Sequence, residues 1–69
     1  MPYSYNKLWK LLIDKNMMKK DLMAKAKITS STIAKMGKGE PVSMDVLGRI
    51  CDALGCNIGD IVDYVREEK

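Results

Sequence analysis

A chain of 69 residues, 46% of them hydrophobic and 30% charged, has the composition of one small globular domain, because so short a chain cannot bury two separate cores. No apolar run approaches the roughly 20 residues that a membrane-spanning helix requires, and the first residues show no secretory signal, so we expect a cytoplasmic location and no membrane partner. The net charge of +3 hides an asymmetry: residues 1–39 carry nine lysines and two aspartates, whereas residues 40–69 carry three basic and seven acidic residues. This division favours an anionic partner for the first half.

The first predicted element is a helix over residues 4–15. Leu8, Leu11 and Leu12 recur at the spacing of one helical face. Ser4 stands where a side-chain oxygen can accept hydrogen bonds from the first free backbone N–H groups. The helix is therefore expected to begin at Ser4 and to turn its leucines inward.

Two short helices should follow, separated by about three residues that break the helical pattern. The first is predicted over residues 19–25 and the break over residues 26–28. Thr29 is a natural N-cap for the second, which should end at a glycine because glycine adopts the left-handed conformation without steric cost. The residues expected to face the core are Leu22, Ile33 and Met36, and the glycines expected to end the second helix are Gly37 and Gly39.

The remaining sequence predicts two more helices. Ser43 should cap a fourth helix that ends at Gly55, and the pair Asn57 and Asp60 resembles a capping box at the start of a fifth. No alternating strand pattern of useful length appears, so the predicted fold is an all-α domain of five helices over residues 4–65. The apolar positions are Leu47, Ile50, Cys51 and Leu54 in the fourth helix and Ile58, Ile61, Val62 and Val65 in the fifth, and residues 66–69 are expected to form a frayed polar tail.

The two cysteines, Cys51 and Cys56, lack the partner Cys or His residues of a four-ligand zinc site, and the chain has no histidine. We therefore expect no metal and no cofactor. Both cysteines lie in an apolar-periodic stretch, which favours reduced thiols used as small core residues over a redox role.

The pair of short helices around residues 26–28 is typical of a DNA-binding helix-turn-helix. In that arrangement the first helix crosses the phosphate backbone and the N-terminal residues of the second meet base edges in the major groove. The second helix here opens with four hydroxyl side chains, residues 29–32, and no acidic residue occurs from Leu22 to Gly39. With Ile33 and Met36 buried, Ser30, Ser31, Ala34 and Lys35 should stand on the exposed side.

The chain resembles the Cro/lambda-repressor-type helix-turn-helix regulators, also called the XRE family. The matching segments are residues 19–22, 28–35, 42–47 and 50–61, within a resemblance that covers residues 5–64. Residues 4–14 also resemble the start of the VanU-type regulators. The resemblance implies a five-helix lambda-repressor-like domain and a sequence-specific DNA-binding transcriptional regulator, such as a repressor.

The same resemblance implies which side chains meet DNA. Lysine can donate to guanine O6 and N7, which makes Lys35 the strongest candidate for specificity. Lys27 and Met23 depart from the family, which commonly has glycine and a small residue there, and these departures leave open a wider or differently shaped turn. The implied base contacts are Ser30, Ser31 and Lys35, and the implied backbone contacts are Lys19, Lys20, Thr29, Thr32 and Lys38.

The predicted partners are double-stranded DNA and a second copy of the chain, with half-sites about 34 Å apart. The fifth helix with Tyr64 is the first choice for the dimer surface, and no small-molecule effector is expected because no effector domain is present. An alternative on the same fold is an antitoxin or a protein-interaction adaptor whose acidic half docks a basic partner. An enzyme is not expected, because no constellation of convergent titratable groups is visible.

Overall fold

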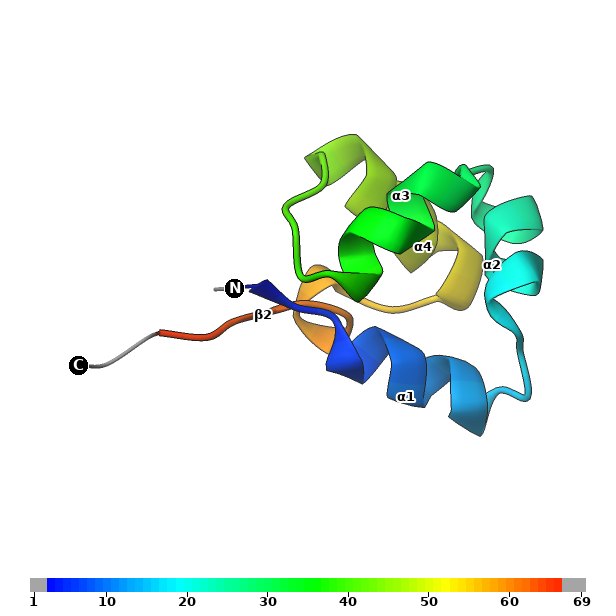
Figure 1. The fold of residues 1–69 in the computed structure, drawn as a ribbon. Helices are drawn as coiled ribbons and strands as arrows, with labels where there is room; N and C mark the ends of the chain where they lie inside the picture. Colours follow the sequence, from blue (N-terminus) through cyan, green and yellow to red (C-terminus); the bar gives the residue numbers. More distant parts are fainter. Residues whose placement is uncertain (1–2, 67–69) are drawn as a thin grey trace.

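The computed structural model describes residues 3–66 of the chain. This part of the chain contains four α-helices. In Figure 1, α1 lies along one side, α3 on the other and α4 behind α3, while β1 and β2 lie side by side. The elements in chain order are β1 (Tyr3–Ser4), α1 (Asn6–Asp14), α2 (Lys19–Ala26), α3 (Ser30–Gly37), α4 (Met44–Leu54), the 3₁₀ helix η1 (Ile58–Asp60) and β2 (Asp63–Tyr64). None of the helices described is long and apolar enough to cross a bilayer.

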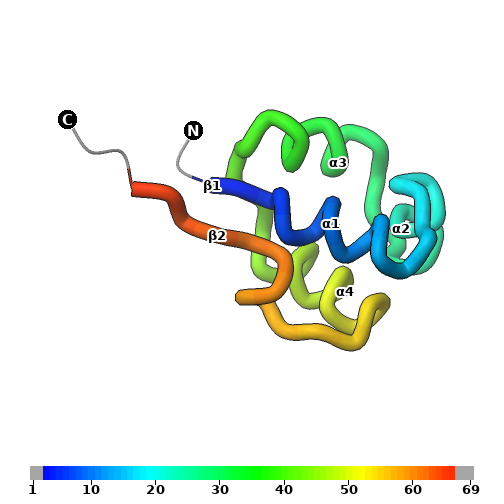
Figure 2. Tube along the Cα trace, turned by 90° about the horizontal axis from the view of Figure 1, so that it is seen from below, coloured from blue at the N-terminus to red at the C-terminus, as the bar shows by residue number. Residues whose placement is uncertain are grey.

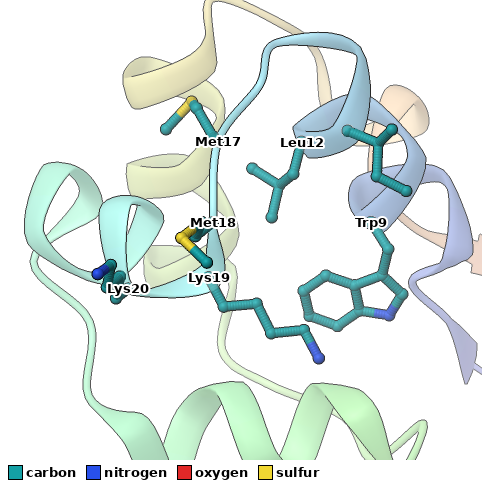
Figure 3. Close-up of a pocket in the computed structure, with 7 residues that line it drawn as sticks. Trp9, Leu12, Met17, Met18, Lys19 and Lys20 are labelled. Atoms are coloured by element: carbon teal, nitrogen blue, oxygen red, sulfur yellow. The ribbon is translucent and has the colours of Figure 1, made fainter.

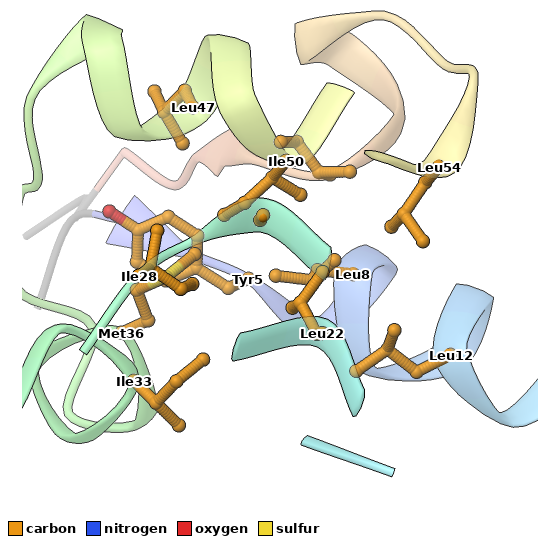
Figure 4. Close-up of a cluster of buried hydrophobic side chains, with 12 residues drawn as sticks. Tyr5, Leu8, Leu12, Leu22, Ile28, Ile33, Met36, Leu47, Ile50 and Leu54 are labelled. Carbon is orange, nitrogen blue, oxygen red and sulfur yellow. The ribbon is translucent and has the colours of Figure 1, made fainter. Parts of the chain in front are cut away.

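One hydrophobic core collects side chains from every α-helix and from the turn after η1 (Figure 4). The inward positions predicted for α1 to α4 are mostly confirmed, although Leu11 and Cys51 are only half-buried. Burying a large aliphatic side chain contributes about 1.5–3 kcal/mol, so this cluster supplies most of the stability of the domain. The largest side chains with less than 2% of their surface exposed are Leu8, Leu22, Met36, Ile50 and Ile61.

A two-stranded antiparallel ribbon joins the two ends of the described chain, as Figures 1 and 2 both show. Tyr3 lies opposite Tyr64, and their rings meet edge to face with centroids 5.5 Å apart. Lys7 on α1 anchors the second strand, because its Nζ lies 3.1 Å from the Asp63 carboxylate and also donates to the Gly59 carbonyl at 3.2 Å. The sequence did not predict this ribbon, because strands of two residues have no periodicity to read.

The predicted fifth helix is wrong, although the all-α class and its helix-turn-helix are confirmed. The expected capping box forms, with the Asn57 N–H donating to Asp60 Oδ2 at 3.0 Å, but it caps only the single 3₁₀ turn of η1. The chain then buries Ile61 completely and turns into β2, whose pairing with β1 replaces further helical hydrogen bonds. Val65 is 48% exposed and is not a core residue. Arg66 is exposed, and the rest of the predicted tail lies outside the described residues.

Of the three hydroxyl side chains predicted to cap helices, two do so. The Thr29 and Ser43 side chains accept hydrogen bonds from the backbone N–H groups three residues on, at 3.3 and 3.2 Å. Ser4 does not begin α1 as predicted, because it lies in β1 and the helix starts at Asn6. Its hydroxyl still accepts a long hydrogen bond, 3.4 Å, from the Asn6 N–H. The ribbon therefore takes the first residue of the predicted helix, and Tyr5 becomes the N-cap.

Candidate nucleic-acid interface

The turn between α2 and α3 adopts the left-handed geometry that glycine usually supplies. Lys27 has φ 57° and ψ 48° and ends α2, so the substitution of lysine for glycine does not widen the turn into another form. Arg49 on α4 supports the turn: its guanidinium donates to the Lys27 carbonyl at 3.2 Å and pairs with Asp45 at 3.0 Å. Met23, the second departure from the family, is half-buried against the core.

Arg49 is a positioning residue that sequence reasoning missed. Asp45 and Arg49 stand four residues apart on α4, a spacing that indicates an ion pair on one helix. Nothing in that spacing shows that the same guanidinium reaches a carbonyl 22 positions earlier in the chain. The contact ties α4 to the turn that sets the direction of α3.

The α3 helix lies with one side in the core and the other open to solvent. Ile33 and Met36 are 8% and 1% exposed and hold the helix against the body of the domain. Ser30, Ser31 and Lys35, the predicted base-contacting residues, are all exposed. Within the described part of the chain, no other element covers these three side chains, so the face is available to a partner.

Three of the four hydroxyls at the start of α3 form one hydrogen-bonded cluster. Thr29 Oγ1 lies 3.0 Å from Ser31 Oγ and 3.1 Å from Thr32 Oγ1, and it also accepts the Thr32 N–H. Thr32 is half-buried, whereas Thr29 and Ser31 are exposed. Because a hydroxyl has one donor and two acceptor positions, Ser31 retains capacity for an additional partner in a fixed orientation.

The lysines predicted to contact the DNA backbone lie at opposite ends of the helix pair. Lys19 and Lys20 occupy the first turn of α2, and Lys38 follows the last turn of α3; all three are exposed. The Lys19 side chain extends toward Trp9 (Figure 3), and its ammonium lies 4.6 Å from the centre of the ring. Trp9 is half-buried and Lys19 is exposed, and a cation over an aromatic ring at the surface gains about 0.5–1 kcal/mol. Trp9 therefore holds this charge in place without neutralising it.

Trp9 also lines an apolar hollow at the junction of α1 and α2 (Figure 3). The hollow has a volume of about 510 Å³, and its apolar walls include Leu12, Met17 and Met18. The partnership of Trp9 with Lys19 carries no sequence signal, because the two residues stand on different helices and meet only when α1 and α2 fold together.

The lysine-rich, acid-free segment between residues 22 and 39 carries its charge on the surface, as the sequence predicted. The four lysines between residues 22 and 39 are all exposed. Within residues 3–66, no group of three side chains suited to a metal ion comes together. The exposed lysines of α2, of the turn after it, and of α3 and its C-cap supply positive charge that can attract an anionic partner. In this segment they are Lys25, Lys27, Lys35 and Lys38.

This chain is similar to known proteins in both sequence and structure. The model of the Cro/C1-type HTH DNA-binding domain matches residues 7–67. The crystal structure of the transcriptional regulator VanUg, in its form II, superimposes with a TM-score of 0.90 at 50% sequence identity, covering 96% of this chain and 88% of that one. No curated protein matches the chain.

Proposed function

The chain belongs to the Cro/C1-type helix-turn-helix DNA-binding family and is similar to VanUg, and on that basis we propose that it is a transcriptional regulator that places α3 in the major groove. The observation that carries the proposal is the open face of α3. A groove about 12 Å wide admits one helix, and the exposed Ser30, Ser31 and Lys35 would be the side chains within it. We further propose that the chain acts by binding alone, in the cytoplasm and without catalysis.

The contacts divide by chemistry. Lys35 reads guanine through O6 and N7, while Ser30 and Ser31 are weaker readers because a hydroxyl pairs with several bases. Lys19, Lys20 and Lys38 bind phosphate oxygens as point charges, and these contacts fix the register without carrying sequence information. The hydroxyls of Thr29 and Thr32 complete the backbone contacts around the start of α3.

We propose that the bound form is a two-fold homodimer. A single α3 reads only a few base pairs. Two copies bound to half-sites about 34 Å apart, one turn of the duplex, contact the same side of the DNA and double the contacts. The recognised site should accordingly be an inverted repeat with a spacing near one helical turn. We propose no small-molecule effector, so that occupancy follows the abundance of the protein or of a partner.

Selection of bound fragments from random duplex DNA tests the proposal most directly, because the recovered site reports base preference and half-site spacing together. Lys35→Ala should weaken binding to that site by about 1–3 kcal/mol and relax preference at one base pair. Lys10→Ala is the matched control, since it removes the same charge from an exposed position of α1, outside the helix pair. If Lys35→Ala leaves the base preference as it was, the assignment of base contacts to α3 is wrong.

Salt dependence separates the DNA-binding proposal from the protein-adaptor alternative. The logarithm of the affinity should fall with the logarithm of the salt concentration by about 0.9 for each phosphate neutralised. Lys19→Ala and Lys38→Ala should each lower this slope by about one and weaken all sequences alike. A chain that recovers no preferred duplex and whose DNA binding does not respond to salt would instead be an adaptor.

A further inference from the structure

The two cysteines meet at the C-terminal end of α4. Gly55 takes the left-handed conformation, with φ 65°, and reverses the chain. The Cys56 N–H then donates to the Cys51 carbonyl at 3.1 Å, and the Gly55 N–H points to the same oxygen. Such a six-residue closure brings the side chains at its two ends into contact. Here both of those side chains are thiols.

The same hydrogen bond limits how far apart the two residues can be. The Cys56 Cα lies about 1.5 Å from its nitrogen, and the Cys51 Cα lies about 2.4 Å from its carbonyl oxygen. Together with the 3.1 Å bond, these lengths hold the two Cα atoms within about 7 Å of each other. Disulfides span Cα separations of about 4.4–6.8 Å, so the backbone already brings the pair close to bonding range.

Both thiols are reduced and pack against the core, as the sequence suggested, but neither is fully buried. Both cysteines are free and half-buried, and each therefore has access to small molecules in solution. Burial, then the neighbouring Cys51, then Asp60 raise the pKa of the Cys56 thiol, while Lys15 acts in the opposite direction. The thiolate is the reactive form, so the pair should react slowly at neutral pH and faster as the pH rises.

We propose that Cys51 and Cys56 form a reversible dithiol site, which a low-molecular-weight disulfide such as oxidised glutathione converts into an internal disulfide. One cysteine thiolate attacks a sulfur of oxidised glutathione and releases one glutathione thiolate, leaving a mixed disulfide. The other cysteine thiolate attacks the protein sulfur of that bond and releases the second glutathione. Two protein thiols are oxidised and one glutathione disulfide is reduced to two thiols.

The bond would fasten the end of α4 to the segment that leads into η1. It closes a loop at a place where the folded backbone is already turned back on itself, so the unfolded chain loses more freedom than the folded chain. A loop of about six residues corresponds to about 2 kcal/mol, so for a domain of this size the melting temperature should rise by about 8–16 °C. The site lies outside α2 and α3, so its chemistry does not depend on whether the chain binds DNA.

The test is incubation of the full chain with oxidised glutathione, followed by intact mass measurement and thermal denaturation. The expected product is a monomer lighter by two hydrogen atoms, with a higher melting temperature, that dithiothreitol returns to the starting mass. Its rate of formation should increase with pH, in step with the raised pKa of Cys56. Cys51→Ser and Cys56→Ser should each stop at one glutathione adduct, with no rise in melting temperature.

Three results would overturn the proposal. The wild-type chain could accumulate separate glutathione adducts on both cysteines, which would mean that the thiols do not reach each other. It could form disulfide-linked dimers on a non-reducing gel instead of an internal bond. The oxidised monomer could melt no higher than the reduced one, which would show that the native turn does not accommodate the bond. The wild-type measurements decide the matter even if a serine variant fails to fold.

Discussion

Replacing Lys27 with glycine should stabilise the domain, an unusual outcome for a substitution in a helix-turn-helix. Lys27 has φ 57°, a conformation that costs a residue with a Cβ about 1–2 kcal/mol. Glycine avoids that cost but gives the unfolded chain extra freedom worth about 0.4–1 kcal/mol. The lysine side chain is exposed, and Arg49 bonds to the backbone carbonyl, so neither packing nor that hydrogen bond is lost. The net gain should be about 0.5–1 kcal/mol.

Thermal and urea denaturation followed by circular dichroism measure this gain. For a domain of 60–100 residues it corresponds to a rise of about 2–8 °C in melting temperature. Lys25→Gly is the matched control, because it removes the same charge from an exposed position that is helical, and it should cost about 1 kcal/mol. Asn16→Gly, at φ 56°, should gain less, because asparagine tolerates the left-handed region. A Lys27→Gly variant as unstable as Lys25→Gly would refute the reasoning.

Other substitutions test the core, the cap and the buried tyrosine. Leu22→Ala, at a side chain with no exposed surface, should cost about 2–5 kcal/mol in urea denaturation, and a loss below 1 kcal/mol would contradict the central packing of α2. Thr29→Ala should cost about 1 kcal/mol through loss of the cap to the Thr32 N–H, whereas Thr29→Ser should retain most of it; equal losses would argue against the cap. Burial raises the pKa of Tyr5 above 10.0, so its contribution to stability is complete below pH 10.0 and is lost as the pH rises through the folded-state pKa. Tyr5→Phe should weaken this alkaline loss in denaturation scans, at the cost of the hydrogen bond to the Glu40 carbonyl, and an unchanged pH profile would exclude Tyr5 as its source.

The helices and the inward-facing residues could be predicted because helical periodicity is a local signal. Leu8, Leu22 and Ile50 each recur with apolar neighbours at the spacing of one helical face, and each is completely buried. The caps Thr29 and Ser43 are equally local, since a hydroxyl bonds an N–H three residues on. The family resemblance is confirmed by the match over residues 7–67.

The prediction of a fifth helix was wrong because the same apolar spacing also fits a 3₁₀ turn followed by a strand. Ile58, Ile61 and Val62 have helical spacing, yet one 3₁₀ turn followed by a strand buries Ile61 just as well. What decides between them is the pairing of Tyr64 with Tyr3, 61 positions away, and no local pattern contains that contact.

The exposed residues of the candidate site could be predicted from the sequence, but the contacts that hold the site in place could not. The exposed face of α3 follows from the burial of Ile33 and Met36, so Ser30, Ser31 and Lys35 could be placed from the sequence. Their roles towards DNA remain predictions. Arg49 reaches the turn only because α4 packs against the helix pair. Trp9 reaches Lys19 only because α1 packs there as well.

The ribbon gives the domain an order of assembly. The helices α2 and α4 pack together although α3 lies between them in the chain, and they are still closer in sequence than the two strands. Because β1 and β2 lie at the two ends, they can pair only after nearly the whole polypeptide has been gathered. The backbone amides of the ribbon should therefore exchange with solvent through local fraying, well before those of α2 and α4 open. Tethering the chain by both ends in a force experiment would peel this ribbon first, while the helix-turn-helix behind it stayed folded.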